Sequence, residues 1–530
     1  MFEIESLPKG LFDKKNTPLL SGILRGVERE ALRTNLDGQL SLKPHPKGLG
    51  SALMHPQITT DFSESLLEFI TPPTHQVDDL LYNLEAIQKF VVSQLEDEIL
   101  WATSMPCSLG KDSEIPVAQY GSSNNGLMKT IYRIGLGHRY GRSMQTVAGI
   151  HYNFSLPNAF WAFLHQEQNS LDELQDFKDK GYFNLIRNFR RHYWLLIYLF
   201  GSSPAICKSF VAGKDHHLQM LDDGHTLHLP YATSLRMGDL GYQSTVQESL
   251  YVCYNDMLSY IKTLCCAITQ PHPTYEAIGT KDDSGKYKQL NNNILQIENE
   301  FYSSIRPKRT ARSGETALSA LQNRGVEYIE VRCLDVNPYS PLGITREQIY
   351  FLDTFLVYCA LQQSPPTDKD EAAKILRNQK RVVNFGRQPN LKLEHNIHGE
   401  TDLSVWGIEL IEAMRPVAEL LDASNHTEGH QASLEMQKSK LVDSSKTPSA
   451  KIINKLSENN LSFAKYALDL SSHYNQFLST HGLPESITKR MHHMAEESTN
   501  EQKSVDDTSK QDFDQFLADY YKQYSLCSGS

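Results

Sequence analysis

The stretch RGVEYIEVRCLDVNP, residues 324–338, indicates most clearly how this chain folds. Its residues alternate in polarity as in a β-strand, where successive side chains point to opposite faces of a sheet. Ile329 and Val331 therefore belong to an apolar face. Glu330 and Arg332 belong to the opposite, polar face. A core strand rarely carries a carboxylate inward, because burying an unpaired charge costs several kcal/mol. The segment predicts a sheet with one apolar face and one face that holds charged groups.

Two earlier segments combine strand-like alternation with carboxylates in the same way. They are RGVERE at 25–30 and TTDFSESLLEFITPP at 59–73. The five carboxylates that the three segments contribute are Glu28, Glu30, Asp61, Glu68 and Glu330. Carboxylates that converge in a core repel one another unless cations lie between them. Because Mg²⁺ prefers hard oxygen ligands and commonly binds nucleotide phosphates, a site with several magnesium ions is the leading interpretation. A solvated strand face is the alternative.

A fourth segment, GIHYNFSLP at 149–157, adds a histidine to this set. His151, Asn153 and Ser155 share one face of the predicted strand, opposite its aromatic residues. A lone histidine is more often a core residue whose hydrogen bonds are satisfied. The polar neighbours of His151 favour a role as a metal ligand instead.

A basic loop, IRPKRTARSGE at 305–315, is suited to nucleotide phosphates. Arg306, Lys308 and Arg309 supply charge-assisted donors of the kind that phosphate oxygens accept. A solvated basic loop is an equally good interpretation of these residues alone. The chain has no GxxxxGK[ST] motif and no GxGxxG after a strand, which argues against a P-loop enzyme and a Rossmann dinucleotide site.

The composition narrows the class of protein further. The chain has 530 residues, 40% of them apolar, and a formal net charge of −11, which argues against general nucleic-acid binding. It has no run of eighteen apolar residues and no signal-peptide pattern, so a cytoplasmic protein without a membrane partner is expected. Its eight cysteines lack a CxxC pair and favour ordinary thiols over a zinc site or a disulfide framework.

The order of segments predicts an α+β fold in two parts. Residues 1–365 contain the strands and are expected to form the catalytic domain. Residues 366–530 follow a proline-rich, charged loop and are expected to form a helical region packed on that domain. Its acidic tail, 495–530, is expected to be solvated or loosely docked. Helical periodicity also predicts single helices at 181–201 and 245–269.

Taken together, these segments closely resemble the proteobacterial glutamate–cysteine ligases, also called γ-glutamylcysteine synthetases. The matching motifs are RGVERE, TTDFSESLLEFITP, SMPC, YGSSN, GIHYNFSLP, YLFGSSPAIC, YATSLRMGDLGY, LQIENEFY, IRPKR and EYIEVRCLDVNPYSP. The resemblance is dense over residues 15–365. It implies a glutamine synthetase-like, curved, mainly antiparallel sheet that forms a funnel-shaped active site surrounded by helices. It also implies ATP-dependent ligation of the glutamate γ-carboxylate to cysteine through γ-glutamyl phosphate, the first step of glutathione biosynthesis.

The same resemblance implies roles for residues of matching type. One magnesium ion is expected on Glu28, His151 and Glu330. A second is expected on Glu30, Asp61 and Glu68, and a third ion is expected to share some of these ligands and bridge the nucleotide phosphates. Arg332 is expected to contact the transferring phosphoryl group, with Glu330 as its catalytic neighbour. Arg133 is expected to contact glutamate, and the cysteine pocket is expected to contain Tyr132, Gln145, Arg236, Tyr242 and Tyr302.

The implied cofactors are two or three Mg²⁺ ions, which Mn²⁺ can replace, with ATP as co-substrate. The implied partners are small molecules only: glutamate, cysteine and ATP, with glutathione as a feedback inhibitor of a monomeric enzyme. Two other hypotheses stay open. A kinase on the same kind of sheet would yield a stable phosphorylated product, and a non-catalytic binding protein would bind ATP without turnover.

Overall fold

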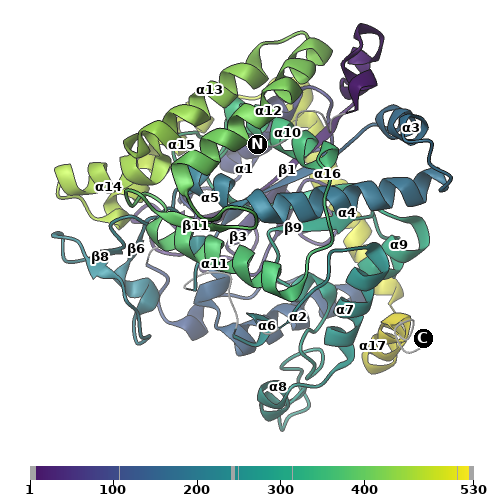
Figure 1. Ribbon diagram of the computed structural model, residues 1–530. Helices are drawn as coiled ribbons and strands as arrows, with labels where there is room; N and C mark the ends of the chain where they lie inside the picture. Colours follow the sequence, from purple (N-terminus) through teal and green to yellow (C-terminus); the bar gives the residue numbers. More distant parts are fainter. Residues whose placement is uncertain are drawn as a thin grey trace.

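The computed structural model describes residues 8–524, apart from 107, 240–244, 249, 313, 481 and 510. Seven described strands form a central sheet in which every pairing is antiparallel (Figure 1). Their order is β2-β3-β1-β5-β10-β9, and β4 pairs with β1. The strands are β1 (Leu24–Asn35), β2 (Ile58–Thr60), β3 (Leu66–Ile70), β4 (Glu98–Leu100), β5 (Gly149–Ser155), β9 (Ile305–Lys308) and β10 (Tyr328–Asp335). The predicted α+β class with a mainly antiparallel sheet is confirmed.

Helices cover the apolar face of this sheet. They are α1 (Val77–Ser93), α4 (Leu174–His192), α5 (Trp194–Phe200) and α10 (Arg346–Leu361). Helix α1 packs on β1, α5 packs on β10, and α10 packs against α4. Val27, Tyr152 and Ile329 come from three neighbouring strands and have no exposed surface. Burying one such side chain stabilises the fold by about 2 kcal/mol, so this face forms the core that holds the strands in register.

Two helices that the sequence predicts as single are interrupted. The segment 181–201 divides at Tyr193, where α4 ends and α5 begins. The segment 245–269 contains α6 (Thr245–Glu248) and α7 (Met257–Thr269). Asp256 starts α7 as its N-cap, because its side chain accepts a hydrogen bond from the Ser259 N–H at 2.8 Å. The prediction of one helix was wrong because a cap can start a new helix within an otherwise apolar periodic run.

The part of the chain after residue 365 is mostly helical. Its elements are α11 (Lys369–Phe385), the hairpin β11 (Lys392–His395) and β12 (Gly399–Asp402), α12 (Leu403–Asn425), α13 (Gly429–Val442), α14 (Pro448–Glu458), α15 (Phe463–Thr480), α16 (Glu485–Thr508) and α17 (Phe513–Lys522). The other elements are α2 (Asn124–Tyr140), α3 (Asn158–Glu167), α8 (Pro273–Ile278), α9 (Ala317–Arg324) and the small sheet of β6 (Ala205–Cys207), β8 (Thr226–His228) and β7 (Gln219–Met220). None of the helices in the described part of the chain is long and apolar enough to cross a membrane.

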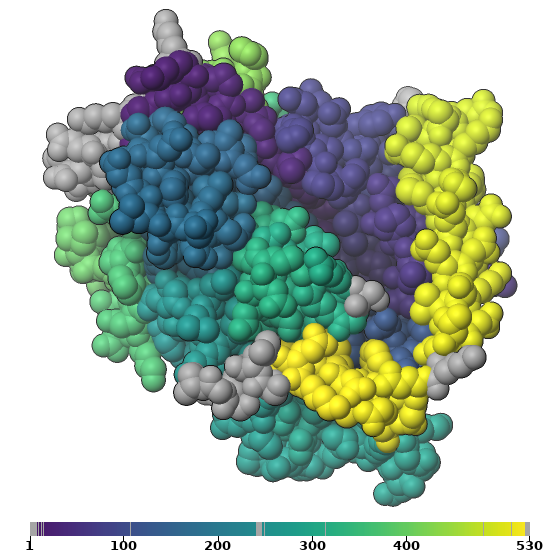
Figure 2. Space-filling model, turned by 90° about the vertical axis from the view of Figure 1, so that its right-hand side faces the viewer, coloured from purple at the N-terminus to yellow at the C-terminus, as the bar shows by residue number. Residues whose placement is uncertain are grey.

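Helix α16 lies along one side of the molecule, over segments from its first third (Figure 2). Ser498 on α16 accepts a hydrogen bond from the Ser51 N–H at 3.0 Å. Asp506, also on α16, accepts from the N–H groups of Ser122 and Ser123 at 3.0 and 2.7 Å. The acidic tail is therefore tied down more firmly than its polar composition indicates, because its polar side chains bond backbone groups of distant loops.

A buried polar cluster lies behind the sheet, on its helix-covered face. Asp353 on α10 binds Arg25 of β1 and Tyr152 of β5, each at 2.7 Å. His430 lies 3.8 Å from Asp353 and 2.7 Å from Asp422. Burial lowers the pKa of His430, but the two carboxylates outweigh it and leave that pKa raised. The cluster links α10, α12 and α13 to the two central strands.

Four of the cysteines whose state is described are free thiols, namely Cys253, Cys266, Cys333 and Cys359. Cys207 and Cys265 are disulfide-bonded. Most of the cysteines were expected to be ordinary thiols, and four of the six whose state is described are free.

Candidate active site

The register of the sheet brings the predicted acidic residues together. Glu28 on β1 lies opposite His151 on β5, and Glu30 lies opposite Glu68 on β3. Glu330 on β10 lies opposite Asn153. Because residues two apart share a face, all these side chains lie on the face away from the covering helices. Four separate sequence motifs thus form one polar surface.

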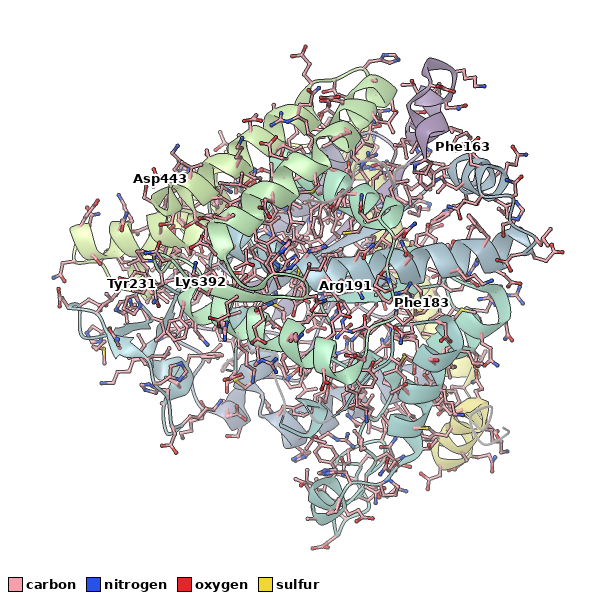
Figure 3. The ribbon with its side chains drawn as sticks, in the orientation of Figure 1. Phe163, Phe183, Arg191, Tyr231, Lys392 and Asp443 are labelled. Atoms are coloured by element: carbon pink, nitrogen blue, oxygen red, sulfur yellow. The ribbon has the colours of Figure 1, made fainter. Side chains whose placement is uncertain are left out.

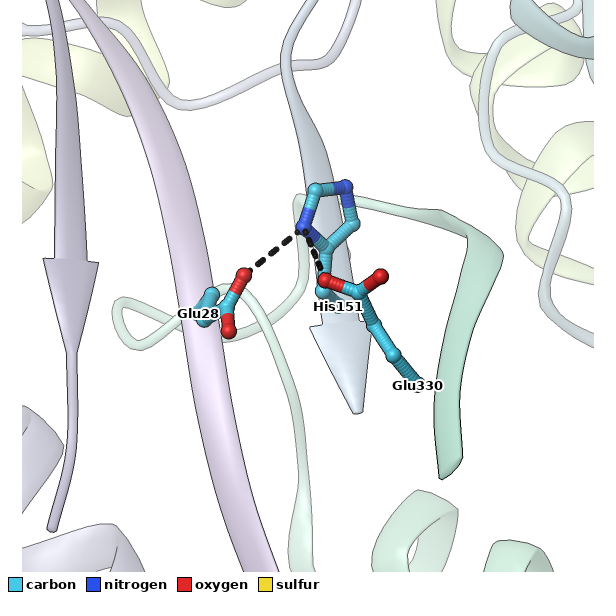
Figure 4. A group of neighbouring side chains, drawn as sticks. All are labelled: Glu28, His151 and Glu330. Atoms are coloured by element: carbon cyan, nitrogen blue, oxygen red, sulfur yellow. Dashed lines mark hydrogen bonds and ion pairs between the residues drawn. The ribbon is translucent and has the colours of Figure 1, made fainter. Parts of the chain in front are cut away.

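Glu28, His151 and Glu330 form the first cluster (Figure 4). His151 Nδ1 lies 3.0 Å from Glu28 Oε2 and 3.8 Å from Glu330 Oε1. The Asn153 amide donates to the other oxygen of Glu28 at 2.8 Å, and its own Oδ1 has no hydrogen-bond partner although it is buried. Two carboxylates, an imidazole and a free amide oxygen within a few ångströms suit a hard divalent cation. Asn153 is absent from the predicted ligand set.

Glu30, Glu68 and His151 form the second cluster. Glu30 Oε1 lies 3.6 Å from His151 Nε2, and the Gly149 N–H donates to Glu30 Oε2 at 2.6 Å. His151 belongs to both clusters, so one ring connects the two candidate metal positions. Asp61 follows the end of β2 and is outside both close groups of ligand atoms.

The surroundings of Glu68 and Glu30 disfavour their ionised forms. Burial raises the pKa of Glu68 well above its usual value, and the charges of Glu28 and Asp61 raise it further. Burial also raises the pKa of Glu30, with Asp61 adding to it and His151 opposing it. Carboxyls in such surroundings favour the proton-bound form unless a cation is present. The donor set therefore fits magnesium, which would hold these groups ionised.

Glu330 differs from its neighbours because two cations lie beside it. Lys308 Nζ and Arg332 Nη1 lie 3.2 and 3.1 Å from Glu330 Oε2. Burial raises the pKa of this carboxyl, but Lys308 and Arg332 outweigh burial and hold it well below the usual value. Lys308 and Arg332 are thus placed at the edge of the acid cluster, where they could donate to the oxygens of a phosphate group.

Two other predicted phosphate-binding residues are placed differently. Arg306 is buried and donates through Nη2 to the carbonyl oxygen of Asn299 at 2.9 Å. Arg309 donates through Nε to the carbonyl oxygen of Gly325 at 2.7 Å. The structure therefore brings Arg309 to a loop backbone and not to the acids. A basic run in sequence could not separate these roles, since they depend on which way each side chain leaves the strand end.

The predicted substrate residues lie around the same face. Tyr302 OH and the Gln145 amide nitrogen are 3.0 Å apart. Arg236 is buried, and its Nη2 donates to the Arg332 carbonyl oxygen at 3.3 Å. Tyr242 lies outside the described residues.

Helix α2 carries the two remaining predicted substrate residues. Tyr132 is half-buried. Arg133 donates to the Asp61 carbonyl oxygen, and its guanidinium lies 4.6 Å from the centre of the Tyr120 ring. Arg133 is thereby placed close to the acid-bearing loop after β2.

A cavity of about 370 Å³ opens beside the acids. His151, Arg236, Tyr302 and Arg332 line it on the side of the sheet. Residues that the sequence analysis did not select line the rest, among them Arg190, Gln247, Tyr251, Val252, Tyr254, Lys369, Ala372, Ile375 and Gln379. Most come from the interrupted 245–269 segment or from α11. No motif marks them, because they meet only through tertiary packing.

Helix α11 is fastened over this cavity by an ion pair. Nε of Arg191, a residue of α4 that Figure 3 labels, lies 2.6 Å from Oε1 of Glu371 on α11. The cavity therefore has one charged wall, formed by the sheet, and one largely apolar wall, formed by the 245–269 segment and α11.

An antiparallel sheet that gathers carboxylates, a histidine and an arginine on one polar face is typical of enzymes that bind nucleotide phosphates with the help of divalent cations. The family model described as glutamate-cysteine ligase matches residues 9–382, and the chain belongs to this family. Similar relatives include glutamate–cysteine ligases from Saccharophagus degradans, 61% identical over 99% of both chains, and Pseudomonas aeruginosa, 49% identical over 95% of both.

Solved structures share the fold of this chain. The crystal structure of glutamate–cysteine ligase from Francisella tularensis in complex with AMP superposes with a TM-score of 0.88. It is 38% identical, and the match covers 95% of this chain and 98% of that one. A bifunctional glutathione synthetase from Pasteurella multocida shares the fold, with a TM-score of 0.70 and 24% identity over 89% of this chain and 55% of that one.

Proposed function

We propose that this chain joins the γ-carboxylate of glutamate to the amine of cysteine, using ATP, and so forms γ-glutamylcysteine for glutathione biosynthesis. The observation that carries the proposal is the Glu28–His151–Glu330 cluster beside Arg332, at the charged wall of the cavity. Membership of the glutamate–cysteine ligase family supports the choice of substrates.

The two acid clusters would hold magnesium, which supplies positive charge to the phosphate oxygens of ATP when bound. Glu28, His151 and Glu330 would hold one ion, and Glu30 and Glu68 with Asp61 a second. A third ion would share ligands with these. Mn²⁺ would replace Mg²⁺, since it accepts the same oxygen and imidazole donors.

The first chemical step is phosphoryl transfer. An oxygen of the glutamate γ-carboxylate forms a bond to the γ-phosphorus, and the bond from that phosphorus to the bridging oxygen of ADP breaks. Arg332 and Lys308 both contact the Glu330 carboxylate, a proposed magnesium ligand. They would therefore lie near the transferring phosphoryl group and bind its oxygens. A planar guanidinium donates two parallel hydrogen bonds to such a group, which orients it as well as stabilising its charge.

The second step is acyl transfer. The cysteine amine, once it has lost a proton, attacks the carbonyl carbon of γ-glutamyl phosphate, and inorganic phosphate leaves with its C–O bond electrons. Tyr132, Gln145, Arg236 and Tyr302, together with Tyr242, would hold cysteine. Arg133 would contact glutamate from helix α2. Among the described residues proposed to hold cysteine, buried Arg236 is the one with a positive charge, and it would bind the cysteine carboxylate.

Further properties belong to the same proposal. Residues 1–365 would form the catalytic domain, with residues 366–530 packed on it and α11 completing the cavity. The enzyme would act as a cytoplasmic monomer, and glutathione would inhibit it because it carries the γ-glutamylcysteine unit of the product.

A coupled assay for ADP tests the activity. ADP release is expected only when ATP, magnesium, glutamate and cysteine are all present. A panel of other amines tests the nucleophile, and equal rates with ammonia and cysteine would overturn the cysteine assignment. Accumulation of a stable phosphorylated product would favour a kinase, and ATP binding without turnover would favour a binding protein.

A further inference from the structure

Tyr302, a residue of the proposed cysteine pocket, lies on a loop that lacks the support of a regular element. The described chain between α8 and β9, residues 279–304, contains no strand and a single short 3₁₀ helix, Glu298–Glu300, just before Tyr302. Backbone groups in such a loop take partners from side chains, because a buried N–H or C=O without a hydrogen bond is costly. The position of Tyr302 therefore depends on the side chains around it.

Gln247, on the short helix α6, binds the backbone of this loop at two points. Its amide nitrogen donates to the Glu300 carbonyl oxygen at 2.9 Å, and its amide oxygen accepts from the Tyr302 N–H at 2.9 Å. Gln247 is 7% exposed and lines the same cavity as Tyr302. Because both bonds come from one planar amide, they fix the direction of the loop backbone as well as its position.

The second hydrogen of the Gln247 amide is directed at Tyr140, the last residue of α2. The amide nitrogen lies 3.1 Å from the Tyr140 hydroxyl oxygen, and that hydroxyl donates to the Glu300 carboxylate at 2.6 Å. Reversing the amide would set its oxygen against the Glu300 carbonyl oxygen and its nitrogen against the Tyr302 N–H, so its orientation is determined. Both amide hydrogens are used within the protein. Gln247 therefore acts on a substrate through Tyr302 and not by direct donation.

A buried ion pair anchors the other end of this network. The Glu300 side chain has no exposed surface, and its carboxylate lies 2.9 Å from Nη1 of Arg139 on α2. The Gln296 N–H donates to the second oxygen of the same carboxylate at 2.7 Å. A buried carboxylate with a cationic partner and further hydrogen bonds is firmly held. The network thus ties the end of α2 to the loop that carries Tyr302.

The aromatic end of Tyr302 is directed by two neighbours. Its ring meets the Tyr140 ring edge-on, with the ring centres 6.3 Å apart, and its hydroxyl lies 3.0 Å from the Gln145 amide nitrogen. Since the ring is rigid, fixing the backbone and one edge determines where the hydroxyl lies. A displacement of about 1 Å in a group that positions substrate can cost about 100-fold in rate.

We propose that Gln247 is a positioning residue for the amino-acid nucleophile, which it serves by holding the Tyr302 hydroxyl at the cysteine side of the cavity. The inference rests on the proposed ligation of cysteine. Without the Gln247 amide, the Tyr302 N–H and the Glu300 carbonyl oxygen would lose these partners and the loop would shift. The acids and Arg332 belong to the sheet, so magnesium and ATP would bind as before.

Steady-state kinetics of the full chain, with each of the three substrates varied in turn, tests this. Gln247→Met keeps a side chain of similar length but removes the donor and the acceptor. We expect KM for cysteine to rise about tenfold, KM for ATP and for glutamate to stay within about twofold, and kcat to fall less than about threefold. Tyr140→Phe loses only a hydroxyl and should raise KM for cysteine about threefold. It decides the matter if Gln247→Met does not fold.

Gln348→Met is the matched control. Gln348 is another buried glutamine, 5% exposed, whose amide oxygen accepts from the Thr345 N–H at 3.0 Å and from the Asn337 amide at 2.7 Å. It lies on α10 and outside the lining of the cavity beside the acids. Its substitution should lower the melting temperature and leave every KM within about twofold.

An unchanged KM for cysteine in Gln247→Met and Tyr140→Phe would overturn the proposal. Equal rises in KM for all three substrates, or the same rise for cysteine in Gln348→Met, would also overturn it, because either result would mean a general loss of structure. A wild type that forms no γ-glutamylcysteine from ATP, glutamate and cysteine would overturn the proposed function itself, and the role of Gln247 with it.

Discussion

Glu330 joins the acid cluster to the two cations beside it, so its charge matters more than its volume. Glu330→Gln removes one candidate metal ligand charge while keeping its shape. We expect kcat to fall by about 100-fold or more, because charge stabilisation in the transition state is lost. The fold should persist, since removing one of several clustered acids relieves repulsion. ADP release and thermal melting measure the two effects.

Glu327→Gln is the control for that variant. Glu327 is exposed and immediately precedes the same strand, and its side chain accepts from the Thr310 N–H. Its substitution should leave kcat within about twofold, as expected for an exposed polar change. If Glu330→Gln instead unfolded the protein, the Glu330 carboxylate of the wild type would form an ion pair that the fold requires.

Arg332 is expected to act through the shape of its guanidinium as well as through its charge. Arg332→Lys retains a positive charge but loses the planar fork, so we expect kcat to fall by about 100-fold. Steady-state kinetics with varied ATP measure this. Arg309→Lys is the comparison variant, because Arg309 donates to a loop carbonyl oxygen and not to the acid cluster. A rise in KM for ATP in Arg309→Lys alone would mean that the phosphates lie nearer the loop than the acid cluster.

At the scale of secondary structure elements, the cluster behind the sheet gives stability a pH dependence. The pKa of His430 is raised in the folded state, so its contribution is complete below the unfolded pKa of about 6.5 and is lost as pH rises through the folded value. We therefore expect His430→Gln to lower the melting temperature most below pH 6.5, with the difference from wild type narrowing in alkali.

The carboxylates of that cluster behave in the opposite way. Burial raises the pKa of Asp353, but Arg25 and His430 outweigh it and leave that pKa lowered. The contribution of Asp353 is therefore present above about pH 4 and lost in acid. Melting curves from pH 2 to 9 separate the two effects. A constant difference between wild type and His430→Gln over that range would contradict the ionised pairing of His430.

Helix α16 braces the helix that carries two predicted substrate residues. Asp506 accepts two N–H groups just before α2 begins, and α2 carries Tyr132 and Arg133. Losing such a capping interaction costs about 1 kcal/mol. We expect Asp506→Ala to raise KM for glutamate or cysteine about fivefold, while kcat changes little. The exposed neighbour Asp507 gives the control, Asp507→Ala, and equal effects of the two variants would argue against a positioning role.

For the whole molecule, magnesium is expected to stabilise the fold. The acids on the sheet face repel one another without cations, and a ligand that binds only the folded state adds about 2.7 kcal/mol at 100 times its Kd. Melting temperatures in MgCl₂ and in NaCl of equal ionic strength test this. Wild type should gain stability in magnesium specifically, and Glu330→Gln should gain less. Equal gains in both salts would leave only ionic screening as the cause.

The sequence predicted the sheet and its acid face well, because alternation over a strand determines which residues share a side. Glu28, His151 and Glu330 were predicted on one surface, and the strand register places them there. Within the predicted helical region 366–530, the individual helices α13 and α16 were not located, since polar residues dominate both segments. The apolar wall of the main cavity was also missed, because α11 reaches it only through packing against α4, which local periodicity does not encode.

The bond between Asp506 and the start of α2 has a consequence for synthesis on the ribosome. Its partners are separated by 384 positions in the chain, which at ordinary translation rates takes about 20–80 s to make. Throughout that interval the nascent protein holds its acid-bearing strands without the brace on its amino-acid-binding helix. Premature termination before α16 would therefore yield fragments that lack this brace, and such fragments would be poor consumers of ATP and cysteine in the cell.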